Sequence, residues 1–431
     1  VGSASFIMKN DIAIYGGFDP DNGIATLADA RILPTELVGG SVLNGQNTRP
    51  IIFNDNNGAN NTAILDGFTL TNGKYTIGGG IYNNGASPTL RNLWIKANTA
   101  TADGGGMYNV NSSSPIMSNV TVSGNTANFA GGIFNRSSSS PVMTNVTIKT
   151  NTANNDGGGM YNDVSASPIM TNVSITGNTA QNGAGMYNRT NSSPILVNAL
   201  IANNTATNNG AAIRNEATSS PSLTNVTIAN NSGTNTLYTT NGTTSLANSI
   251  VYGTISGAYT PHYSLIQGNT DFTNGNIDAT GITLTDVFTN PSTGDYTLKI
   301  TSPAINAGSN SLFTGLNADT KDLAGNVRVY DFANSGVIDL GAYESDSGTL
   351  STIDFGANNE VKVYPNPFTD VLRISKMNDI KAMFLYDMSG RLIKKIAPTT
   401  ELDLSSLSKE SYLLVIIMED NQTKTFKVIK K

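Results

Sequence analysis

Two acidic residues occupy equivalent places in a recurring segment, and paired carboxylates are the groups that glycoside hydrolysis requires. Asp103 and Asp156 each stand five residues before a tyrosine, two copies of the segment apart. If neighbouring copies stack as strands of a parallel sheet, the two carboxylates lie about 10 Å apart, at the wide limit for an inverting pair. Phe129 holds the same place in the copy between them. Loop acids at a glycine corner are the competing interpretation, so no catalytic residue is assigned.

The histidine and cysteine content limits the other chemistries. His262 is the only histidine and lies in AYTPHYSL, outside the regular copies. One histidine cannot build a multi-histidine metal site within one chain. A Ser-His-Asp triad would have to use His262, and no nucleophile elbow occurs near it. The chain has no cysteine, which excludes thiolate ligands, disulfides and a cysteine nucleophile.

Four aspartates gather near residue 330, close to Lys321 and Arg328. They are Asp319, Asp322, Asp331 and Asp339. Clustered carboxylates with a basic residue nearby would suit Ca²⁺ in a polysaccharide lyase, because Ca²⁺ prefers oxygen ligands. Capping of turns is the competing role for such aspartates. The sequence therefore assigns no cofactor and keeps Ca²⁺ as the one metal to test.

An aromatic column is the candidate for binding. It consists of Tyr82, Tyr108, Phe134, Tyr161 and Tyr187, and it ends in Arg214. The preceding column is purely aliphatic, and neighbouring strand residues face opposite ways. Because Arg214 is not expected to be buried unpaired, the aromatic column is predicted to face outwards. Stacked rings stabilise one another without a ligand; the alternative is a strip that binds a sugar or peptide.

All these candidates depend on a repeat of 26 or 27 residues. The repeat is marked by Pro88, Pro115, Pro141, Pro168, Pro194 and Pro221. The second, fifth and seventh residues after each proline are apolar and the residues between them are mostly polar, an alternation typical of strands with one buried face. The fourth and tenth residues are always Asn. A fixed period in this range indicates a solenoid or another repeat architecture.

The repeat favours a right-handed parallel β-helix with three short strands per turn. Strands this short cover their apolar face only if copy stacks on copy. Asn tolerates left-handed backbone at a corner, and its amide is suited to bond the Asn of the next copy. The geometry predicts that Val120 and Val146 are vertical neighbours. A β-propeller is the alternative, but its blades need about 40 residues.

Composition bounds the function. Charged residues make up 13% of the 431 residues and the net charge is −6, so no basic footprint for nucleic acid is present. No apolar run is long enough for a transmembrane segment. The sequence begins at Val1 without a secretory signal, and we expect it to be a fragment or a processed form of a longer protein.

The chain is predicted to divide into a β-helix over residues 1–290, its end or cap over 291–345, a linker over 346–360 and a small domain over 361–431. YGGF, the GGGMYN…SPIMSNVTVSGNTA units and DYTLKITSPAINAG…DLAGNVR…IDLGAYE resemble the β-helix domains of choice-of-anchor Q surface proteins and polymorphic outer membrane protein repeats. The resemblance covers roughly residues 5–345 and implies a protein of the bacterial surface.

The last segment has a different character. Lys is frequent, and alternating strand patterns predict an Ig-like β-sandwich. VYPNPF, YDMSGRLI, LDLSSL and the final FKVIKK resemble the C-terminal sorting domain of the type IX (Por) secretion system of Bacteroidetes, although Ser411 precedes Tyr412 where the family often has Gly. The resemblance implies that residues 361–431 engage the type IX machinery, and that the chain is exported through the outer membrane and then anchored to the cell surface or released.

The function expected from the sequence is that of a secreted β-helix protein displayed at the cell surface, of adhesin or scaffold type. Its partners beyond the export machinery would be glycans or the surface of a host or neighbouring cell. The alternative is a protein that binds or degrades polysaccharide. If the chain is an enzyme, a polysaccharide lyase or glycoside hydrolase is the class that the fold favours.

Overall fold

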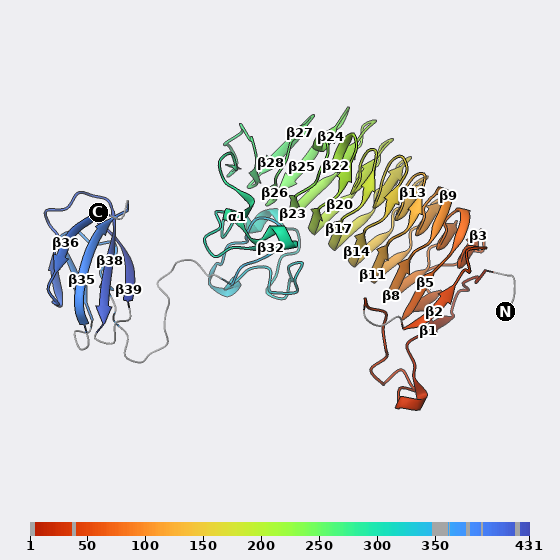
Figure 1. The fold of residues 1–431 in the computed structure, drawn as a ribbon, viewed down its shortest axis with the longest axis horizontal. Coiled ribbons are helices and arrows are strands. Elements are labelled where there is room, and N and C mark those ends of the chain that lie inside the picture. Colours follow the sequence, from red (N-terminus) through yellow and green to blue (C-terminus); the bar gives the residue numbers. More distant parts are fainter. Residues whose placement is uncertain are drawn as a thin grey trace. The chain divides into compact units, whose positions relative to one another are not determined.

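The structure is a computed structural model that describes residues 5–36, 40–346, 361, 363–375, 380–388, 391–418 and 423–431. The chain divides into two compact units, Val1–Thr349 and Leu350–Lys431. The first unit is a parallel β-solenoid, in which successive turns of chain stack as rungs along three parallel sheets (Figure 1). The predicted all-β fold and its parallel solenoid are confirmed.

Sheet 1 is the longest of the three sheets. Its central path is β1 (Ala13–Tyr15), β4 (Ile64–Asp66), β8 (Thr89–Lys96), β11 (Ile116–Ser123), β14 (Val142–Lys149), β17 (Ile169–Thr176), β20 (Ile195–Ala202), β23 (Ser222–Ala229), β26 (Ile250–Val251), β29 (Leu265–Ile266) and β30 (Ile277–Asp278). Off this path lie β2 (Ser41–Asn44), β5 (Phe68–Thr71), β25 (Thr244–Ala247) and β28 (Tyr259–His262).

Sheets 2 and 3 complete each turn. Sheet 2 contains β3 (Ile52–Asp55), β7 (Ile81–Asn84), β10 (Met107–Val110), β13 (Ile133–Arg136), β16 (Met160–Asp163), β19 (Met186–Asn188), β22 (Asn209–Asn215), β24 (Asn235–Thr239) and β27 (Ile255–Ser256). Sheet 3 contains β6 (Lys74–Ile77), β9 (Thr99–Asp103), β12 (Thr126–Ala127), β15 (Thr152–Ala153), β18 (Thr179–Ala180) and β21 (Thr205–Ala206).

The register follows the sequence repeat. Val120 pairs with Val146 in the parallel ladder between β11 and β14, so the predicted vertical neighbours are confirmed. The aliphatic residues that face inwards from sheets 1 and 2 form one continuous core along the rod, with side chains such as Ile95, Met107 and Met143 fully buried. Each rung therefore buries its apolar face against its neighbours above and below.

Two columns of Asn lie inside the rod. In one column, the side-chain amide of Asn125 donates to Asn151 Oδ1 at 2.9 Å and Asn151 donates to Asn178 Oδ1 at 3.0 Å. In the other, Asn109 donates to Asn135 Oδ1 at 2.8 Å and the pattern repeats from Asn54 to Asn215. The predicted amide ladders are confirmed, and they satisfy polar groups that burial would otherwise leave unpaired.

The third Asn column, four residues after each proline, has a different role. Asn119 and Asn145 adopt φ of 53° and 55°, at the position where the sequence predicted a corner between short strands. Sheet-1 strands such as β11 instead run for eight residues through this point. Left-handed backbone, which Asn tolerates, bends the strand here without ending the ladder. The column therefore lies on the outside of sheet 1.

The C-terminal part of the first unit folds back along the rod. It contains α1 (Leu284–Val287), the antiparallel pair β31 (Phe288–Asn290) and β32 (Asp295–Leu298), and the 3₁₀ turns η2 (Pro291–Thr293), η3 (Asn310–Leu312) and η4 (Phe332–Asn334). Phe288, Tyr296 and Leu340 pack with the outward-facing Leu200 and Ile250 of sheet 1. The segment thus covers the side of the last rungs.

The second unit consists of two antiparallel sheets. Sheet 4 contains β33 (Val363–Tyr364), β34 (Val371–Ile374) and β37 (Glu401–Asp403); sheet 5 has the order β36 (Leu392–Ile396), β35 (Ile380–Asp387), β38 (Ser411–Met418) and β39 (Thr423–Ile429). Leu372 and Leu402 of sheet 4 share one core with Leu385 and Leu414 of sheet 5. The two sheets therefore pack face to face around their own core.

Replacing a buried ladder residue should destabilise the solenoid. Asn151→Ala removes the acceptor of the Asn125 amide and leaves the carbonyl of Val122 without its 3.0 Å bond. We expect a loss of at least about 2 kcal/mol in the free energy of unfolding, because buried polar groups become unsatisfied. Trp94, the only tryptophan, reports unfolding of this unit by fluorescence in a denaturant titration.

Asn154→Ala is the matched control. Asn154 is exposed and donates to Asn128 Oδ1 at 2.8 Å, so its loss should change the free energy by no more than about 0.5 kcal/mol. Equal stability of the two variants would contradict the role assigned to the buried ladder.

Candidate binding surfaces

The aromatic column lies outside the coil, as predicted, but its rings are buried. The column runs on the outer side of sheet 2, and Tyr82, Tyr108 and Tyr161 are only 9%, 5% and 4% exposed. Ring centroids of Phe134 and Tyr161 lie 4.8 Å apart, and those of Tyr161 and Tyr187 lie 4.7 Å apart. The stack is a closed outer core that leaves little ring area for a ligand.

The column is also longer than the sequence indicated. Phe53 stacks on Tyr82 at 4.9 Å. At the other end, Arg214 lies between Tyr187 and Tyr238, with its guanidinium carbon 5.5 and 5.1 Å from the two ring centroids. The repeat had ended the column at Arg214 because the spacing to Tyr238 is 24 residues. The paired register of Arg214 with Tyr238 restores the missing rung.

Charged residues border the column. Arg136, Asp163, Arg189 and Glu216 follow the buried Asn of four successive rungs, so their charges alternate in sign. The hydroxyl of Tyr187 donates to Glu216, which also accepts from Arg214. Burial would raise the pKa of Glu216, but these two partners outweigh it and the pKa is lowered. Burial raises the pKa of Tyr161 to about 12, so this hydroxyl stays neutral at physiological pH.

Asp103 and Asp156 do occupy one column, yet they do not form a facing pair. Asp103 bridges to Phe129 of the next rung, and Asp156 bridges to Asn182. The amide of Asn182 donates to Asp156 Oδ1 at 2.8 Å. Burial raises the pKa of Asp103. The rung of Phe129 separates the two carboxylates, which is the arrangement of structural loop acids.

The four aspartates near residue 330 are not brought together. Asp319 and Asp331 are exposed, whereas Asp322 and Asp339 are buried. Among the described residues, no group of three or more acidic or histidine side chains is arranged to hold a metal ion. The predicted Ca²⁺ cluster is therefore not formed by this set, because two of its members point into the protein and two into solvent. His262, the last residue of β28, is exposed.

Arg328, which is fully buried, is the centre around which the two buried aspartates lie. Its Nη2 donates to the carbonyls of Asp339 and Gly341, each at 2.8 Å. Its Nη1 lies 3.8 Å from Glu344 Oε2, and burial lowers the pKa of Arg328. The carboxylates accept backbone N–H groups, as Glu344 does from Asp339 at 3.0 Å. The cluster holds the C-terminal segment in shape, and Glu344 is the member that sequence reasoning missed.

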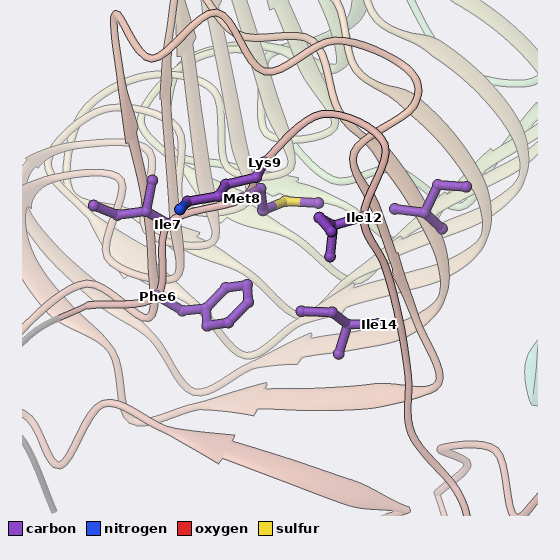
Figure 2. Close-up of a pocket in the computed structure, with 7 residues that line it drawn as sticks. Phe6, Ile7, Met8, Lys9, Ile12 and Ile14 are labelled. Carbon is purple, nitrogen blue, oxygen red and sulfur yellow. The ribbon is translucent and has the colours of Figure 1, made fainter.

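Two hollows occur at the ends of the solenoid, and neither gathers catalytic groups. At the first turn, Phe6, Met8, Ile12 and Ile14 surround a space of about 210 Å³ in which Lys9 is the only charged side chain (Figure 2). Near α1, a space of about 430 Å³ is lined by amides and by Tyr252. The described residues that line the first hollow are mostly apolar, and those that line the second include no acid.

The outer face of sheet 1 is covered at both ends by other segments. On the N-terminal side, the excursion that contains η1 (Pro20–Asn22) reaches across it: Arg31 Nη2 binds Asp66 at 2.8 Å, and Glu36 pairs with Lys149. Figure 1 shows this excursion projecting from the N-terminal end of the rod. On the C-terminal side, the amide of Asn198 donates to the carbonyl of Lys321 at 2.8 Å.

Beside these covers, an array of side chains on β11, β14, β17 and β20 stays accessible, which we call the open face. Its aliphatic column consists of Ile116, Val142, Ile169 and Ile195. One column of hydroxyl side chains consists of Ser118, Thr144 and Thr171, and a second consists of Thr121, Thr147 and Ser174. The amides of Asn119, Asn145 and Asn172 lie between the two hydroxyl columns. The aliphatic side chains are 40–45% exposed. The Asn145 amide donates to Asn119 Oδ1 at 3.2 Å. Sequence reasoning did not single out the aliphatic column, whose members are the first residues of the sheet-1 strands, directly after each proline.

The comparisons with known proteins concern the second unit. The family model for the secretion system C-terminal sorting domain matches residues 362–431. No curated protein matches the chain. The sorting domain indicates export across the outer membrane to the cell surface or outside, and it implies an interaction with the type IX machinery. Among the described residues, no helix has the length and apolarity needed to cross a membrane.

The aromatic column should matter for stability. Tyr161→Ala removes a ring that stacks on both neighbours, and we expect the free energy of unfolding to fall by about 3 kcal/mol or more. Tyr161→Phe keeps the ring and should retain most of the stability. Trp94 fluorescence in a denaturant titration measures both. A Tyr161→Ala variant as stable as the wild type would show that the stack carries little energy.

The C-terminal segment of the solenoid should loosen as pH rises. Burial raises the pKa of Glu344 to about 8 from an ordinary 4.5, and that of Asp339 to about 6. The folded state therefore keeps protons that the unfolded chain releases, and the stability they supply is lost as pH rises through about 8. Hydrogen exchange of residues 323–345, corrected for the intrinsic rate, should show falling protection over this range.

Glu344→Gln is the control for this effect. The amide is neutral at every pH, so protection in the variant should depend much less on pH between about 6 and 9. An unchanged pH dependence would assign the effect to a group other than Glu344.

Proposed function

We propose that this protein is a surface-displayed adhesin of scaffold type, in which the solenoid is the exported cargo and the open face is its contact surface. The observation that carries the proposal is the accessible aliphatic column on β11, β14, β17 and β20, beside the covered parts of the same sheet. Contiguous exposed apolar side chains on a folded protein commonly mark an interaction site. The likeness to choice-of-anchor Q and polymorphic outer membrane proteins belongs to this proposal.

The chemistry of the open face suits a glycan on a neighbouring surface. Apolar side chains such as Ile169 offer flat area to the C–H face of a sugar ring, while hydroxyls such as Thr171 and the Asn145 amide offer hydrogen bonds. Rungs about 4.8 Å apart repeat these groups along the rod axis, so an extended polymer meets the same pattern several times. Repetition of weak contacts raises the overall strength of binding.

A polysaccharide-degrading enzyme is the alternative from the sequence. It requires acids and a base that converge on one substrate position. The described residues place Asp103 and Asp156 on rungs separated by Phe129, and they bury Asp339 and Glu344 around Arg328. These arrangements support binding by the rod better than bond cleavage by it.

The open face should lose its ligand when its aliphatic column is made polar. In Val142→Ser/Ile169→Ser, two adjacent exposed side chains lose their apolar area, and we expect retention on a glycan array or on neighbouring cells to fall at least tenfold. Ile300→Ser is the control, since Ile300 is 75% exposed outside the open face. Trp94 fluorescence checks that each variant is folded.

Equal retention of the wild type and the double variant would dispose of the open face as the contact surface. Release of oligosaccharides by the purified protein, measured on acidic polysaccharides, would instead favour the enzyme alternative.

A further inference from the structure

The matched sorting domain and the rest of the chain carry opposite net charge. Residues 362–431 hold twelve Lys and Arg against eight Asp and Glu, whereas residues 1–361 hold thirteen against twenty-three. The sorting domain is therefore +4 and the rest of the chain −10, counted without histidine. A basic domain on an acidic protein is expected to meet an acidic partner, because complementary potentials steer association.

The two faces of sheet 5 differ in what covers them. Met383 and Leu385 of β35 and Leu414 and Ile416 of β38 point towards sheet 4 and are fully buried in the shared core. Successive strand residues point to opposite faces. The residues between them are only half-buried and do not belong to that core. They form the outer face of the sheet.

The outer face of the two central strands is apolar. We call it the sheet-5 patch; it consists of Phe384, Tyr386, Leu413, Val415 and Ile417. Phe384 lies opposite Val415, and Tyr386 lies opposite Leu413. The two rings are 6.4 Å apart. Side chains directly opposite one another on one face form a continuous surface, so the patch is one flat apolar strip.

Lysines flank the patch on both neighbouring strands. Lys395 of β36 lies opposite Phe384, with its Nζ 5.8 Å from the ring centroid, and Lys427 of β39 lies opposite Leu413. Both lysines are exposed. Across the sheet, one row therefore runs Lys395, Phe384, Val415 and Thr425, and the next runs Leu392, Tyr386, Leu413 and Lys427. An apolar centre with a basic rim is the anatomy of a protein docking surface.

We propose that the sheet-5 patch is the surface through which the sorting domain docks on the export machinery, against a flat apolar area with acidic side chains at its edge. The proposal deepens the assignment of residues 362–431 to a sorting domain and is independent of what the solenoid binds. The patch side chains are half-buried and flanked by exposed lysines, which acidic side chains at the edge of a partner protein would complement. Lys395 and Lys427 would pair with the acidic side chains of the partner, and the outer faces of β35 and β38 would make the apolar contact.

Export in a bacterium that carries this secretion system tests the proposal with the full chain. Phe384→Ser/Val415→Ser should lower the amount at the cell surface and in the medium at least tenfold, with accumulation in the periplasm. Lys395→Glu/Lys427→Glu, which leaves the core untouched, should lower it severalfold. Val371→Ser is the matched control: Val371 is 37% exposed on the outer face of sheet 4 and its variant should be exported as the wild type is.

The outcomes separate the alternatives. Normal export of both double variants would overturn the proposal. Loss of export in the Ser variant alone, together with protease sensitivity of the sorting domain in the purified chain, would also overturn it, because folding and not docking would be the cause. Binding to vesicles of phosphatidylglycerol that falls in the variants while export stays normal would assign the patch to lipid. Glycan retention by the purified variants should be unchanged, which keeps this test distinct from that of the open face.

Discussion

The fold depends on one constraint: every polar group inside the rod must find its partner on the next rung. The backbone meets it through parallel ladders, and the buried Asn columns meet it through amides such as that of Asn151, which donates to Asn178 at 3.0 Å. An amide has both a donor and an acceptor, so each Asn can donate to the Asn of the next rung and accept from the Asn of the rung before it. Buried polar groups otherwise cost free energy, which explains why Asn and not an apolar residue recurs at these positions.

The same residue type does different work on the outside. In the middle of the rod, the outer Asn column bonds to itself, as Asn145 does to Asn119. Towards the C-terminal end, Asn198 and Asn225 turn their amides to carbonyls of the segment that folds back, Lys321 and Asp339. The outer Asn column thus forms a ladder of side chains in the middle of the rod, whereas near the C-terminal end it binds the segment that folds back. This change limits the open face on that side.

Exposure and function do not follow from residue type in this molecule. The aromatic column offers the larger rings, yet its members are buried beside charged residues such as Arg189. The open face offers smaller aliphatic side chains, yet they remain 40–45% exposed. In the sorting domain the apolar outer face of sheet 5 is likewise left half-covered. The surfaces that remain open are those over which no other segment of the described chain folds.

The sequence by itself determined the repeat, the direction in which each side chain points, the buried amide ladders and the separate sorting domain. Period-two alternation within a fixed repeat sets which side chains of each rung point into the core and which point outwards. Val120 and Val146 are paired and buried as this pattern predicts. Only the tertiary structure decided which outward columns are covered, how Arg328 gathers Asp339 and Glu344, and that Asp319 and Asp331 stay apart from them. The contacts that cover sheet 1 join residues more than a hundred positions apart, such as Asn198 and Lys321, and the Arg328 cluster lies in a segment that has no period. Short-range pattern carries no information about such pairs, because packing between distant segments sets them.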